Sequence, residues 1–223
     1  MEQIPIPLGE PGFLPRFQTD RQGCKGRAWL RAPSCVVDSG PPSAGEGIPY
    51  VDGPPPQIAD GFGDETCHKC HFENNFNDPV GSLGLDGVPE NYVSGEQYVI
   101  EIVIERREIG RGGFQLAARF ANGDQAGVQA GSLAPLDERV EVVTEENTQV
   151  QYARQTLSGS LPGPEDTTSW SVRWTAPEDA AGPVRFNLAG NASNDDASEF
   201  GDFVYTAEAL SRPPWLVRHN DLR

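Results

Sequence analysis

The chain has 223 residues, 37% of them hydrophobic, and a formal charge of −16. This length allows one large all-β domain or a domain with an extension. The acidic charge excludes a nucleic-acid partner, because the phosphate backbone would repel it. No apolar run of about 18 residues or more occurs, so the sequence predicts no transmembrane segment.

Residues 1–66 are rich in proline and glycine, as in GEPG at 9–12 and GPPP at 53–56. Such segments disfavour helices and central strands. We therefore predict an irregular, extended arm that lies along a surface, either that of its own domain or that of a neighbouring subunit.

Residues 67–71 read Cys-His-Lys-Cys-His, the C-x-x-C-H pattern by which haem c is attached to protein. Cys67 and Cys70 can form thioethers to the two vinyl groups of one haem. His71 can then reach the iron as its proximal ligand. The motif predicts one covalent haem on a segment spanning 67–90.

The second axial ligand is less constrained by the sequence. Met1 is the single methionine, so a His/Met pair would need the N-terminus. His68 lies inside the attachment loop, on the wrong side of the ring. His219 near the C-terminus is the candidate distal iron ligand, and the alternatives are an exposed tail histidine, water or a residue of a partner.

Two other interpretations of the motif stay open. Cys67, Cys70 and His71 could join a fourth ligand, such as Cys24 or Cys35, in a zinc site. Alternatively, the two motif cysteines could form a disulfide beside an incidental histidine.

Aromatic residues near the motif, namely Phe62, Phe72 and Phe76, would suit the edge of a haem or could simply anchor a loop.

Haem attachment to this motif is expected outside the cytoplasm, where Cys24 and Cys35 would form a disulfide. The first residues show neither the basic nor the apolar region of a signal peptide. We expect the numbering to begin after processing, and the protein to lie in the periplasm or on the extracellular face of a bacterial membrane.

From residue 91 onward apolar and polar residues alternate with a period of two, which is typical of strands. We expect an antiparallel, immunoglobulin-like β-sandwich of about seven to eight strands over residues 91–210, followed by a C-terminal tail at 211–223. The alternating segments are 97–105, 114–120, 140–142, 150–152, 170–174, 184–188 and 203–207.

The loop before the last expected strand is acidic, with Asn194, Asp195, Asp196, Glu199 and Asp202. Its oxygen atoms could bind calcium. An exposed turn rich in Asx residues is the favoured interpretation.

Several short segments between residues 91 and 205 are informative as a set: NY at 91–92, GEQY at 95–98, GFQL at 113–116, QAG at 125–127, WTAP at 174–177, GPVRF at 182–186, AGNA at 189–192 and GDFVY at 201–205. In their order and spacing they resemble the reelin-type (Reeler) β-sandwich and its bacterial choice-of-anchor relatives. Bacterial members often carry a single C-x-x-C-H before the sandwich. The resemblance implies an exported, immunoglobulin-like domain. It does not imply an enzyme, because such a sandwich is a scaffold for many functions.

Together these features predict an exported monohaem c-type cytochrome that transfers single electrons and is not a catalyst. Its partners would be redox proteins or subunits of a photosynthetic or respiratory membrane complex, and its acidic surface could steer a basic partner. The alternative is a structural or docking subunit in which haem is absent or secondary, or a zinc-binding adaptor.

Overall fold

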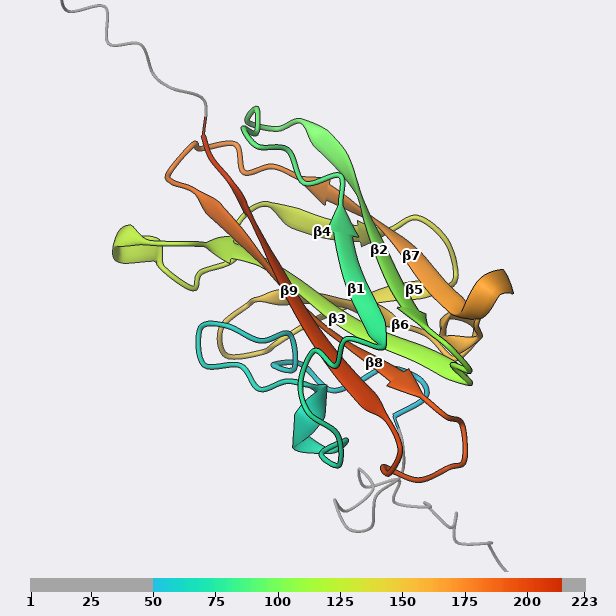
Figure 1. The fold of residues 1–223 in the computed structure, drawn as a ribbon. Coiled ribbons are helices and arrows are strands. Elements are labelled where there is room, and N and C mark those ends of the chain that lie inside the picture. Colours follow the sequence, from blue (N-terminus) through green and yellow to red (C-terminus); the bar gives the residue numbers. More distant parts are fainter. Residues whose placement is uncertain (1–49, 214–223) are drawn as a thin grey trace, which may run out of the picture. The chain divides into compact units, whose positions relative to one another are not determined.

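The computed structural model describes residues 50–213 (Figure 1). Met1, Cys24, Cys35 and His219 lie outside the described residues. Nine strands are present in the described part: β1 Gly81–Asp86, β2 Gln97–Arg106, β3 Arg111–Phe120, β4 Ser132–Pro135, β5 Val140–Thr144, β6 Gln151–Gln155, β7 Thr167–Thr175, β8 Val184–Ser193 and β9 Phe203–Ser211. Four short 3-10 helices are η1 Cys67–Lys69, η2 Gly123–Gln125, η3 Ser158–Ser160 and η4 Pro164–Asp166.

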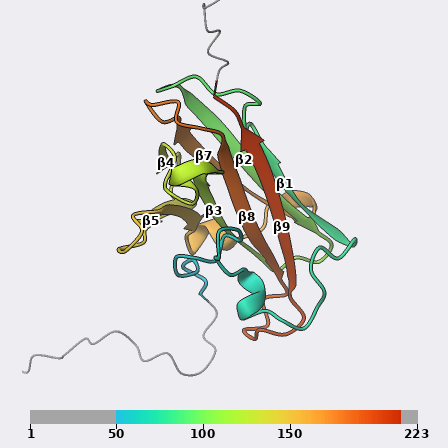
Figure 2. The ribbon, with the colours of Figure 1, turned by 90° about the vertical axis from the view of Figure 1, so that its left-hand side faces the viewer.

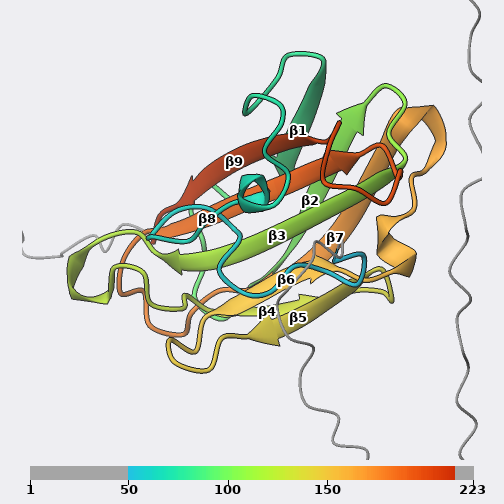
Figure 3. The same cartoon turned by 90° about the horizontal axis from the view of Figure 1, so that it is seen from below.

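The strands form two antiparallel sheets that face each other (Figure 3). The four-stranded sheet has the order β1-β2-β7-β4, and the five-stranded sheet has the order β5-β6-β3-β8-β9. The predicted all-β antiparallel sandwich is confirmed. No helix within residues 50–213 has the length and apolar character needed to cross a membrane.

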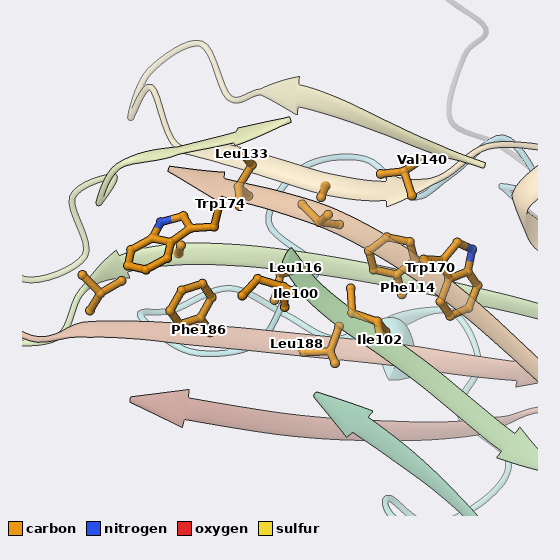
Figure 4. Packing of buried hydrophobic residues seen from close by; sticks show 14 of the residues in the cluster. Ile100, Ile102, Phe114, Leu116, Leu133, Val140, Trp170, Trp174, Phe186 and Leu188 are labelled. Carbon is orange, nitrogen blue, oxygen red and sulfur yellow. The ribbon is translucent and has the colours of Figure 1, made fainter. Parts of the chain in front are cut away.

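The core lies between the sheets because each strand sends alternate side chains inward. In β2, Ile100 and Ile102 are fully buried and lie opposite Val172 and Trp170 of β7. Phe186 of β8 packs edge-on against Trp174 of β7, with ring centroids 4.8 Å apart (Figure 4). These aromatic and branched side chains exclude water from the interior and provide most of the driving force for folding.

Two strands were missing from the sequence-based prediction. β1 lies inside the segment 67–90 that was assigned to the haem motif, and it pairs with β2 through Leu83 opposite Ile104. β4 is four residues long, ends at Pro135 and pairs with β7. The motif segment therefore continues directly into an edge strand of the sandwich.

The segment at 50–66 covers the outer face of the five-stranded sheet (Figure 2). Phe114 and Leu116 of β3 point into the core, so Gln115 and Arg119 point outward. Gln115 accepts from the backbone N–H of Ile58 at 2.7 Å and donates to the Pro55 carbonyl at 2.8 Å. This part of the expected arm is thus held on its own domain.

Candidate functional site

One helical turn presents the C-x-x-C-H side chains. The Thr66 hydroxyl accepts from the backbone N–H of His68, which caps η1 at its N-terminus. The N–H groups of Cys70 and His71 both donate to the Cys67 carbonyl, at 3.2 and 3.0 Å. Residues three and four apart share one face of such a turn, so Cys67, Cys70 and His71 lie on the same side.

All three side chains line one pocket of about 450 Å³, between the turn and the outer face of the five-stranded sheet. This volume lies within the range of about 300–1,000 Å³ that is usual for small-molecule and cofactor sites. Its apolar wall includes Pro54, Pro55, Pro56 and Ile58.

The pocket is largely apolar, and both motif cysteines line it. Cys67 is buried in the wall, whereas Cys70 is exposed at the surface, so the pocket is open to solvent on the Cys70 side. Both thiols are free, and the structure thus contains no Cys67–Cys70 disulfide. The buried Oδ1 of Asn191, which also lines the pocket, has no hydrogen-bond partner among the described residues.

His71 is backed by a buried carboxylate. Its Nδ1 lies 2.6 Å from Oδ2 of Asp202, whose side chain is 0% exposed, while the His71 side chain is 18% exposed. The two atoms are within ion-pair distance, but their geometry does not make a hydrogen bond. This contact occupies Nδ1 and leaves Nε2 of His71 as the nitrogen that can bind a metal.

His68 is not among the residues that line this pocket. Its Nε2 donates to the Asn74 carbonyl at 3.2 Å, and its ring stacks on Phe76 with centroids 4.3 Å apart. Phe72 packs edge-on against Phe200, at 5.8 Å between centroids. These contacts show that Phe72 and Phe76 anchor the loop. Phe62 instead has the Arg119 guanidinium over its ring.

The two motif thiols differ in burial and therefore in reactivity. Loss of solvent raises the pKa of Cys67 to about 12, because the apolar surroundings disfavour the thiolate. The thiolate is the nucleophile in alkylation.

We expect iodoacetamide at about pH 8 to label Cys70 much faster than Cys67 in the folded, haem-free protein. Peptide mapping by mass spectrometry gives the two rates separately. Denaturant should remove the difference, and equal labelling of both residues in the folded protein would contradict the observed burial.

The acidic loop is built as a series of Asx turns. Oδ1 of Asn194 accepts from the backbone N–H of Asp196, and Oδ1 of Asp196 accepts from that of Ser198. Oδ1 of Asp202 accepts from the N–H of Asn194 at 3.0 Å. Within residues 50–213, no group of three or more His, Cys, Asp or Glu side chains is arranged to hold a metal ion.

Sequence reasoning did not find the partner of His71. Asp202 was assigned to the acidic loop, because nothing in the local pattern links it to a histidine so far back along the chain. The pocket residues Arg111, Ser160 and Asn191 were missed for the same reason.

No protein-family profile and no curated protein matches this sequence. Among solved structures, the chain is similar to the reeler domain of human F-spondin, with 22% identity, 60% of this chain and 89% of that chain covered, and a TM-score of 0.38. A second F-spondin structure, described as its Reelin-N domain, shows 18% identity, coverage of 65% and 96%, and a TM-score of 0.39.

A cohesin module from a Clostridium perfringens family 33 glycoside hydrolase shows 11% identity, coverage of 60% and 98%, and a TM-score of 0.38. Reeler domains are also what residues 91–207 resemble in sequence. At these identities and TM-scores the similarity is distant, and it assigns no function to this chain.

Proposed function

We propose that the protein is an exported monohaem c-type cytochrome that carries single electrons and catalyses no bond chemistry. The observation that carries this proposal is the convergence of Cys67, Cys70 and His71 on one largely apolar pocket. A zinc ion needs a compact tetrahedral set of ligands, whereas this pocket has room for a much larger group.

In this function each motif residue has a separate task. Cys67 and Cys70 would hold the haem covalently through two thioether bonds. Nε2 of His71 would be a nitrogen ligand to its iron. When bound, haem would supply reversible one-electron chemistry. His219 remains our candidate for the second iron ligand and lies outside the described residues.

The test is a visible spectrum and an intact mass of the protein exported in a host that matures c-type cytochromes. We expect a sharp α-band on reduction with dithionite and a mass increased by one haem. The double variant Cys67→Ser/Cys70→Ser should lose both signals. The matched control is His68→Ala, which changes the same loop outside the pocket and should keep both.

A colourless wild-type protein with the mass of the polypeptide alone would overturn the cytochrome proposal. Zinc released by acid from such a protein would support the zinc-binding alternative instead.

We also propose that the protein acts as a subunit of a larger extracytoplasmic electron-transfer assembly. This is supported by Phe72 and Phe200, which contact each other next to His71 and are both about half exposed. Exposed aromatic side chains are enriched at protein interfaces. A docking role would persist if the protein contained no haem.

A further inference from the structure

We infer that Asp202 is a positioning residue that sets the electron affinity of the iron held by His71. The inference rests on the proposed haem function and concerns the carboxylate behind the proximal histidine.

The fold fixes the Asp202 carboxylate on both sides. Asp202 directly precedes β9, and its Oδ1 accepts from the backbone N–H of Asn194 at 3.0 Å. Nδ2 of Asn191 in β8 donates to Oδ2 at 3.4 Å, and Nδ1 of His71 lies 2.6 Å from the same oxygen. The carboxylate therefore cannot turn away from the imidazole without breaking contacts to two other residues.

No arginine or lysine in the described part of the chain forms an ion pair with Asp202. Arg111, the arginine that lines the pocket, pairs with Asp195 and donates to Ser160. Lys69 pairs with Glu65. Among residues 50–213, His71 is the one basic side chain in ion-pair contact with Asp202. A buried charge acts strongly on its neighbours because little water screens it.

The direction of the effect follows from the charges. The Asp202 carboxylate lies 2.6 Å from Nδ1 of His71, so its negative charge acts on the ligating imidazole at short range. A nearby negative charge stabilises iron(III) relative to iron(II). Reduction adds one electron to the iron and breaks no bond, so Asp202 lowers the reduction potential.

The experiment compares the midpoint potential of wild-type protein with that of Asp202→Asn at about pH 7. Asparagine keeps the shape and an acceptor for the Asn194 N–H but loses the charge. At a fixed solution potential we expect the ratio of reduced to oxidised iron to rise about tenfold in Asp202→Asn. This corresponds to a midpoint potential higher by about 59 mV for a one-electron couple. The haem content, read from the mass and the α-band, should not change.

The matched control is Asp196→Asn, which removes the same charge from the exposed part of the same loop and leaves its turn acceptor in place. We expect no more than a small shift in this variant. Equal potentials for wild type and a haem-loaded Asp202→Asn would overturn the inference, as would equal shifts in Asp202→Asn and Asp196→Asn.

Asn191→Ala provides a second measurement that does not depend on the folding of Asp202→Asn. It removes the amide that donates to the same Asp202 oxygen that His71 contacts, so this oxygen's negative charge acts more strongly on His71. The midpoint potential should therefore shift in the opposite direction, toward oxidised iron. An unchanged potential or a shift toward reduced iron in this variant would also overturn the inference. Absence of haem from the wild-type protein would refute the proposed function itself, which keeps the two failures distinguishable.

Discussion

Arg119→Leu is expected to lower the free energy of unfolding by about 3–5 kcal/mol, the usual cost of removing one partner of a buried ion pair. Arg119 is 2% exposed. Its guanidinium donates to Oδ2 of Asp64 at 3.0 Å and to the Asp60 carbonyl at 2.8 Å. These bonds fasten the segment that leads into Cys67 to the outer face of β3. Denaturant unfolding measures the loss.

The pH dependence of this variant has a definite sign. Burial raises the pKa of Asp64 above its ordinary value of 3.8, although Arg119 opposes the rise. Without the arginine the folded pKa rises further, so the folded state binds more protons than the unfolded state above about pH 4. The destabilisation by Arg119→Leu should therefore grow as the pH increases through this window.

The matched control for Arg119→Leu is the double variant Arg119→Leu/Asp64→Asn. It removes the uncompensated carboxylate as well, and replacing both partners of a buried pair is often close to neutral. The double variant should recover a large part of the lost stability and lose the pH dependence. A double variant as unstable as Arg119→Leu alone would contradict this account of the ion pair.

Trp174→Ala is expected to cost about 3–5 kcal/mol of stability, because a large buried ring leaves a cavity that the sandwich cannot close. Trp174 is fully buried and packs on Tyr92, Tyr98 and Phe186. Its Nε1 donates to the Ala130 carbonyl at 2.9 Å. Thermal or denaturant unfolding followed by circular dichroism measures the effect.

Val99→Ala serves as the control on the same sheet. Val99 lies in β2 but is 47% exposed, so its truncation should change stability by no more than about 0.5 kcal/mol. Similar losses in Trp174→Ala and Val99→Ala would show that the ring does not anchor the core.

The sandwich was predictable wherever apolar residues alternated over a long enough run. The isoleucines of β2 and the tryptophans of β7 follow this period without interruption, so both strands were found. β1 was missed because Gly81 and Gly84 break the apolar pattern. The structure explains why a glycine occupies position 81. A Cβ at Gly81 would lie 2.4 Å from the Tyr205 hydroxyl, so this position of the strand has no room for a side chain.

The site was predictable only as far as it is local in sequence. The spacing of Cys67, Cys70 and His71 places them on one face of a single turn, and the structure has this turn. Asp202 reaches His71 only because β9 pairs with β8 and the motif segment packs against β8 (Figure 3). That proximity depends on the pairing of distant segments, which periodicity within a strand does not encode.

The burial of Cys67 has implications for the order of maturation. The Cys67 sulfur packs among Ile58, Ala189 and Val204, so a group that must bond to it gains access only when this segment moves off the sheet. Cys70 is already exposed, and the core between the sheets contains none of residues 57–71. The sandwich could therefore complete its folding before the proposed haem is attached, and the cysteine-bearing segment could join it last.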